Sequence, residues 1–219
     1  MKRKDEQQTT IIGGESGPTA VFIAGKGDGF KMPLKDRIRN KRYQMLRRRA
    51  EKKIKPGAHT KEETIAYAKE KYDFLPVSPD QRKYKNEKKS VREGIIYKHR
   101  PELVGELLHI TTPDHSDKES LQEFFRLLEE RERKIEAIPE EAVPMEFQMY
   151  ELAMEKGHLE MVLDFQWDLF GVNYGGERKQ MKKFKRIAQD LYSYYGVTEE
   201  DIKNKTERYS ALVCALADF

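Results

Sequence analysis

The longest apolar run in this chain, residues 11–25, limits what the chain can fold into because it is too short and too interrupted to span a membrane. It covers 15 residues and contains Gly13, Gly14, Glu15, Gly17 and Pro18, whereas a spanning helix needs about 20 apolar residues in succession. The same interruptions break the continuous apolar region of a secretion signal. We therefore expect a cytoplasmic protein without integral membrane insertion, and the single cysteine agrees with a reducing compartment.

Charge is distributed unevenly along the chain. Residues 1–100 contain 27 Lys and Arg against 13 Asp and Glu, a net charge of +14, whereas residues 101–219 have a net charge of −10. Such a split is typical of a basic half that meets a polyanion, or of two halves that attract each other. We expect a tail and glycine-rich hairpin over residues 1–32, a basic helical segment over 33–100 and an acidic helical domain over 101–219.

Two β-favouring runs near the N-terminus, residues 9–12 and 19–24, flank a glycine-rich turn. Glycine and proline at this density are typical of a hairpin loop. An isolated two-stranded hairpin is only marginally stable in water, so this one is expected to pack on helices or on a partner. The motif residues at its tip are Gly13, Gly14, Ser16, Gly17, Pro18 and Thr19.

The stretch IIGGESGPTAVF, residues 11–22, resembles the signature IIGGADGPTAIF of the beta subunit of sodium-ion-translocating decarboxylases. The resemblance implies sodium transport, in which a carboxylate and unwound backbone handle the ion inside the membrane. Ser16 stands where that family has its aspartate. The family's many membrane helices have no counterpart in this sequence, so sodium transport is retained only as a disfavoured alternative.

A strongly basic helix is expected between Pro33 and Pro56. Residues 31–55 contain 12 Lys and Arg but only Asp36 and Glu51 as acids, and cations spread around a helix are typical of nucleic-acid binding. A solvated face, or a clamp on the acidic half, is the competing interpretation. The candidate nucleic-acid- or anion-binding residues are Arg37, Arg39, Arg42, Arg47, Arg48, Arg49 and Lys52.

The rest of the chain also shows helical spacing. Thr60 and Glu63 form a predicted capping box for a helix that runs to about Tyr72, and Thr198 is a predicted cap for the last helix. Between them, apolar residues at three- and four-residue intervals predict helices over about 117–138, 144–155, 158–170 and 177–195. The predicted fold class is therefore mainly α, an antiparallel helical bundle or array with a short N-terminal β-hairpin.

Residues 151–173 contain the run ELAMEKGHLEMV, which resembles the helix-turn-helix of an ankyrin repeat. No second copy follows at a period near the ankyrin repeat length, and a lone repeat cannot bury its own apolar face. The resemblance implies a helical hairpin at this position, with His158 at the start of its second helix.

No convincing catalytic or metal-binding constellation is present in the sequence. His109, Asp114 and His115 lie close together but lack a fourth ligand at suitable spacing. Cys214 lies among apolar residues of the last helix and is expected to be a core residue rather than a nucleophile. We expect no cofactor and no bound metal. The hypothesis is a non-catalytic binding or adaptor protein, whose basic half contacts a nucleic acid or an acidic protein.

Overall fold

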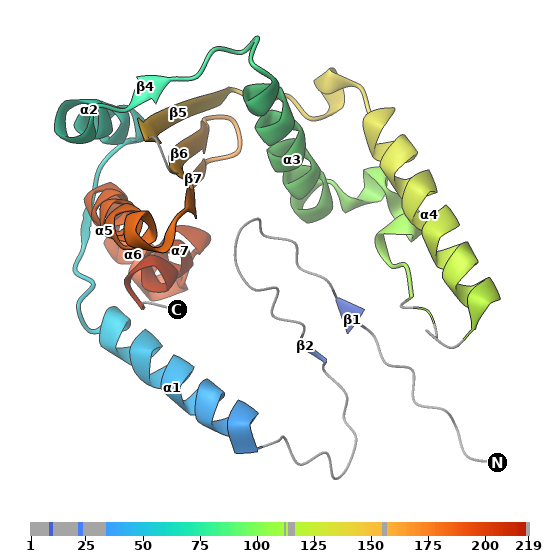
Figure 1. Ribbon diagram of the computed structural model, residues 1–219, viewed down its shortest axis with the longest axis horizontal. Coiled ribbons are helices and arrows are strands. Elements are labelled where there is room, and N and C mark those ends of the chain that lie inside the picture. The colour runs from blue at the N-terminus through green and yellow to red at the C-terminus, as the bar shows by residue number, and fades with distance from the viewer. Residues whose placement is uncertain are drawn as a thin grey trace. The chain divides into compact units, whose positions relative to one another are not determined.

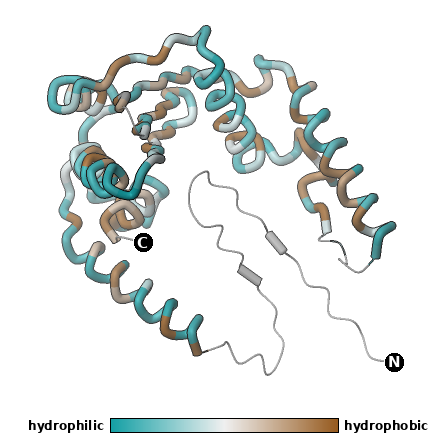
Figure 2. Tube along the Cα trace, viewed as in Figure 1, coloured by the Kyte–Doolittle hydropathy of each residue, from teal (hydrophilic) through white to brown (hydrophobic). Residues whose placement is uncertain are grey.

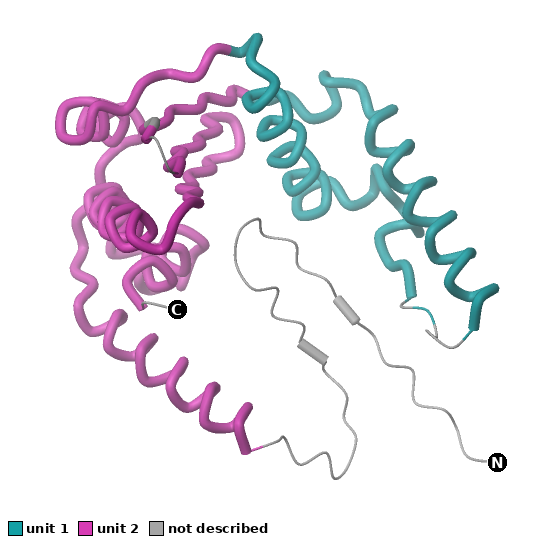
Figure 3. The backbone as a smooth tube through the Cα atoms, viewed as in Figure 1, with its two compact units in different colours: residues 1–29, 79–145 teal, residues 30–78, 146–219 magenta. Residues whose placement is uncertain are grey.

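The computed structural model describes residues 34–111, 113, 117–154 and 157–217, together with the strands β1 (Thr9–Thr10) and β2 (Phe22–Ile23). The chain divides into two compact units, one of residues 1–29 and 79–145 and the other of residues 30–78 and 146–219 (Figure 3). β1 and β2 pair antiparallel, with Thr9 opposite Ile23, as the expected hairpin requires. The glycine motif between them lies outside the described residues.

The second unit is built on an antiparallel sheet with the strand order β4-β5-β6-β7 (Figure 1). The three long strands follow one another in the chain and form a meander, while the short strand β4 pairs with β5. Their bounds are β4 Leu75–Pro76, β5 Phe147–Met154, β6 Gly157–Asp164 and β7 Leu169–Gly176.

Two helices, α2 (Lys61–Tyr72) and α5 (Arg178–Tyr195), cover one face of this sheet. Alternate residues of a strand point to the same face, and on β6 these are Leu159, Met161 and Leu163. All three are fully buried against Ile65 of α2 and against α5. The α5 contribution comes from Phe184, Ile187 and Leu191. The main apolar core of the second unit therefore lies between the sheet and these two helices.

A second apolar cluster joins the two chain segments of this unit, residues 30–78 and 146–219. It combines Ala50 of α1 (Leu34–Glu51), Val197 of β8 (Gly196–Val197) and residues of α7 (Glu207–Leu216). A short helix, α6 (Glu199–Asn204), precedes α7, and β8 pairs with β3 (Gly57–Ala58).

The described part of the first unit is helical. It contains α3 (Arg82–His99), the 3-10 turns η1 (Pro101–Leu103) and η2 (Gly105–Leu108), α4 (Lys118–Glu136) and the turn η3 (Glu140–Ala142). Lys134 of α4 donates a hydrogen bond to the carbonyl oxygen of Val104 at 2.9 Å. Arg92 of α3 donates to the carbonyl oxygen of Ile138 at 2.6 Å. These long side chains hold the turns against the helices.

The prediction of a helical bundle with only a short hairpin is wrong, because residues 147–176 form three strands instead of helices. The helical hairpin implied by the ankyrin resemblance is likewise replaced by the β5–β6 strand pair, in which Glu151 lies opposite Glu160. Met161, Val162, Leu163 and Asp164 are all buried. A strand buried on both faces reads as a continuous apolar run, which periodicity alone does not distinguish from a buried helix.

Candidate nucleic-acid interface

The predicted basic helix is present as α1, and most of its side chains are exposed. Leu, Lys and Arg are good helix formers, Asp36 lies in the first turn, and Arg48 and Arg49 lie in the last turn, where cations favour the helix dipole. Among the described residues, the apolar contacts of α1 lie at its C-terminal end: Ala50 is 2% exposed and packs, with Leu46, in the cluster around α7. Residues 34–45 are exposed apart from Asp36.

The candidate cations divide into paired and unpaired groups. Arg39 forms an ion pair with Asp36 at 3.1 Å, and Arg47 forms one with Glu51 at 3.0 Å. Within the described residues, no ion pair involves the remaining exposed cations of the helix, which are Lys35, Arg37, Lys41, Arg42, Arg48 and Arg49. Lys52 lies in the turn after the helix, also exposed, and its backbone N–H donates to the carbonyl oxygen of Arg48.

Apolar side chains form an exposed line along the same helix. Leu34 is 71% exposed, Ile38 61% and Met45 45%. At about 100° per residue, these three positions fall within roughly 40° of one another around the helix axis. Figure 2 shows such apolar residues recurring along an otherwise hydrophilic α1. We call Leu34, Ile38 and Met45 the apolar stripe of α1.

A second basic surface lies on α5, in the half of the chain that is acidic by sequence. Lys179, Lys182, Lys183 and Arg186 are all exposed. Their spacing of three and four residues places them on one side of the helix, and the buried Phe184 lies on another side. The sequence analysis missed this stripe because residues 101–219 are acidic on average, with a net charge of −10. The recurrence of Lys and Arg every three or four residues was the signal that could have revealed it.

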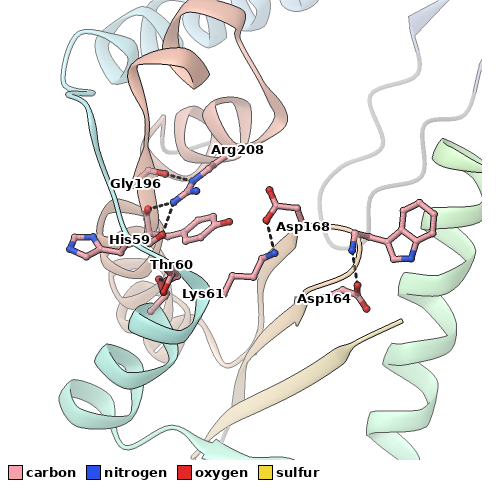
Figure 4. Close-up of polar contacts among 10 residues, drawn as sticks. His59, Thr60, Lys61, Asp164, Asp168, Gly196 and Arg208 are labelled. Atoms are coloured by element: carbon pink, nitrogen blue, oxygen red, sulfur yellow. Dashed lines mark hydrogen bonds and ion pairs between the residues drawn. The ribbon is translucent and has the colours of Figure 1, made fainter. Parts of the chain in front are cut away.

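Arg208 fixes the segment that leads from α1 to α2 (Figure 4). Its guanidinium donates to the carbonyl oxygens of Gly196 and His59, both at 2.8 Å, and to that of Tyr195. It also lies over the Tyr195 ring, 3.7 Å from the centroid. One side chain therefore satisfies the backbone on both sides of the β3–β8 pair, next to the point where α1 joins the unit.

Two buried polar groups near the β6–β7 turn have structural roles (Figure 4). The buried Lys61 ammonium pairs with Asp168 at 2.5 Å. Asp164 is fully buried, and its Oδ1 accepts a hydrogen bond from the backbone N–H of Trp167 at 2.9 Å, which closes the turn. Among the described residues no group of three His, Cys, Asp or Glu side chains is placed to hold a metal ion.

The other sequence candidates are placed as follows. Cys214 is exposed, so its predicted core position is wrong. His109 is exposed, whereas Asp114 and His115 lie outside the described residues. The motif residues Gly13, Gly14, Ser16, Gly17, Pro18 and Thr19 also lie outside them.

Within the part of the chain that the structure describes, no helix is both long and apolar enough to cross a membrane. Comparisons with protein-family models, with curated proteins and with solved structures find no match to this chain.

Proposed function

We propose that this chain is a cytoplasmic, non-catalytic nucleic-acid-binding protein that contacts phosphates through α1. The observation that carries the proposal is the projection of α1 from its unit with six cations that have no carboxylate partner among the described residues. A helix retained only for packing would bury one side along its length. α1 buries only its C-terminal end.

Nucleic acid is favoured over an acidic protein because of where the cations lie. When 100° is added per residue, Arg37 and Arg48 lie about 20° apart on one side of the helix, and Arg42 lies about 120–140° away on another side. Phosphates line both sides of a nucleic-acid groove, so cations on two sides of one helix can contact the two rows of phosphates. An acidic protein surface would meet only one side of α1.

The proposal predicts a steep salt dependence of binding. Each neutralised phosphate of B-DNA contributes about 0.9 to the slope of log K against log salt concentration. If the six unpaired cations each reach a phosphate, the slope is about −5. The basic stripe on α5 would increase it if that stripe reaches the same nucleic acid.

The test compares two charge-matched triple variants. Arg37→Gln/Arg42→Gln/Arg48→Gln removes three cations from α1, and Lys118→Gln/Arg126→Gln/Arg133→Gln removes three from exposed positions of α4. Binding is measured by fluorescence anisotropy with a labelled 20-base-pair duplex at several salt concentrations. Only the α1 variant should bind more weakly, by roughly tenfold or more, and the magnitude of its slope of log K against log salt concentration should be smaller by about three.

Two results would refute the proposal. In one, the wild-type protein has no measurable affinity for duplex or single-stranded nucleic acid at low salt. In the other, both triple variants lose affinity to the same extent, which would assign the effect to overall charge and not to α1. If an acidic protein bound α1 while nucleic acid did not, the protein-partner hypothesis would replace this one.

A further inference from the structure

The apolar stripe of α1 has no role in phosphate binding, because phosphates are contacted by cations and not by Leu34, Ile38 or Met45. Its exposure is high for apolar side chains, at 71%, 61% and 45%. The stripe is also separate from the anchored side of the helix: Leu46 and Ala50, which pack near α7, lie roughly 100° or more away around the axis.

Cations border this stripe on both sides. With about 100° per residue, Arg37, Lys41 and Arg48 fall on one side of the stripe, and Lys35, Arg42 and Arg49 fall on the other. The resulting surface is apolar along its middle and positive along both borders. A nucleic-acid groove has the complementary arrangement, with base edges along its floor and phosphates along both walls.

The dimensions of the exposed part of α1 suit the major groove of B-DNA. Residues 34–45, which are exposed apart from Asp36, span about 18 Å at 1.5 Å per residue. A helix with its side chains is about 10–12 Å across, and the B-DNA major groove is about 12 Å wide. The major groove of an RNA duplex is deep and narrow and does not admit a helix.

We infer that residues 34–45 of α1 lie in the major groove of duplex DNA, with Leu34, Ile38 and Met45 against the methyl groups of thymine. The methyl group is the only apolar feature that a base pair presents in this groove. The inference rests on the proposed function and adds the class of nucleic acid, the groove and a base preference to it.

Two other occupants of the stripe fit less well. A helix lying on a membrane surface needs a broad apolar face, whereas this stripe is about 40° wide and holds three residues. A second copy of the chain would bring the bordering cations of two α1 helices together, and like charges at short range repel. DNA supplies both the negative charge and the apolar contact.

The experiment replaces thymine by uracil in an otherwise identical A·T-rich DNA duplex, which removes only the methyl groups. Anisotropy titrations should show weaker binding to the uracil duplex, by about fourfold for each methyl group that leaves an apolar contact. An RNA duplex of the same sequence should bind more weakly than either DNA.

The matched variants separate the stripe from the cations. Leu34→Ala/Ile38→Ala removes two of the three stripe residues, so it should reduce the difference between the two DNA duplexes by roughly tenfold or more and leave the salt slope unchanged; alanine favours helix, so α1 should persist. Leu75→Ala, which truncates another apolar residue that is 64% exposed, should retain the difference. Circular dichroism checks that each variant is folded.

Equal affinity for the thymine and uracil duplexes would overturn the inference, and so would equal or tighter binding of the RNA duplex. Binding to phosphatidylserine vesicles that is lost in Leu34→Ala/Ile38→Ala, without a preference between the DNA duplexes, would assign the stripe to a membrane surface instead. The proposed function fails separately, because it requires only that the α1 cation variant loses affinity and salt slope.

Discussion

Replacing Gly196 by alanine should strongly destabilise the unit that carries α1. Gly196 has φ 61° and ψ −162°, a backbone conformation that is nearly confined to glycine and costs other residues about 1–3 kcal/mol. An added Cβ would also lie 1.8 Å from the carbonyl oxygen of Gly57. That atom belongs to the backbone of the paired strand β3, so no side-chain rotation relieves the overlap.

The β3–β8 pair must therefore open, and the backbone carbonyls held by Arg208 move with it. Adding the loss of one or two hydrogen bonds, each worth about 1 kcal/mol, to the backbone strain gives a destabilisation of roughly 2–5 kcal/mol. With a urea m-value of about 1–3 kcal/mol/M for a unit of this size, the midpoint should fall by at least about 0.7 M.

Trp167 provides the assay, because it is the only tryptophan in the chain and lies in the β6–β7 turn of the same unit. Urea unfolding followed by its fluorescence reports on this unit. Gly57→Ala is the matched control: a Cβ at Gly57 meets nothing within 4 Å, so this variant should unfold within about 1 kcal/mol of the wild type. A Gly196→Ala midpoint equal to that of Gly57→Ala would refute the reasoning.

Three further predictions concern the same unit. Phe184→Ala, at a fully buried core position, should cost about 3–5 kcal/mol in urea unfolding, and an effect below about 1 kcal/mol would contradict the assigned core. Burial alone would raise the pKa of Asp190, but hydrogen bonds from Lys71 and two tyrosines lower it overall. The resulting stabilisation is present above the pKa of the unfolded state and is lost as pH falls through the pKa of the folded state. Asp190→Asn should therefore flatten the acid limb of a curve of unfolding free energy against pH. Burial raises the pKa values of Tyr192 and Tyr195 to about 12, so stability should fall as pH rises from about 10. In a titration followed by phenolate absorbance, Tyr192→Phe should show one fewer tyrosine that ionises late than the wild type.

Local signals predicted several helix boundaries correctly. Thr60 and Glu63 form the expected capping box of α2, with both reciprocal hydrogen bonds present. Thr198 caps a helix as expected, although that helix ends at Asn204 and α7 begins separately at Glu207. Such caps depend on residues three or four positions apart, and for this reason a single sequence reveals them.

The sheet was not predictable in the same way because one of its pairings is distant in the sequence and burial of β6 on both faces hides the alternation that marks a strand. β4 pairs with β5 across about seventy residues of intervening chain that belong to the other unit. Within β6, the buried residues Leu159, Met161 and Leu163 alternate as expected for a strand. Val162 between them is also apolar and buried, and the resulting apolar run suggests helical spacing instead. Tertiary burial of both strand faces, and not intrinsic propensity, decided the outcome here.

The basic surfaces of the candidate interface are visible in the sequence where charge is local and hidden where charge is averaged over a long segment. α1 stands out because 12 of residues 31–55 are Lys or Arg, whereas the α5 stripe disappears in the net charge of −10 for residues 101–219. Which α1 cations are paired, and which side of the helix is anchored, depends on contacts with Asp36, Glu51 and α7. Only the last of these contacts is non-local.

Folding also changes what the charge split means. The two compact units interleave the halves of the sequence: the unit of residues 30–78 and 146–219 contains 25 Lys and Arg against 19 Asp and Glu, and the other contains 17 against 19. The net charges of the two units are therefore +6 and −2, much smaller than the +14 and −10 of the two halves of the sequence. A modest net charge attracts a polyanion only weakly at physiological salt, where screening acts beyond about 8 Å. Under the proposed function, affinity for nucleic acid comes from cations concentrated at short range on α1 and α5, and for this reason removing three of them should matter more than removing three elsewhere.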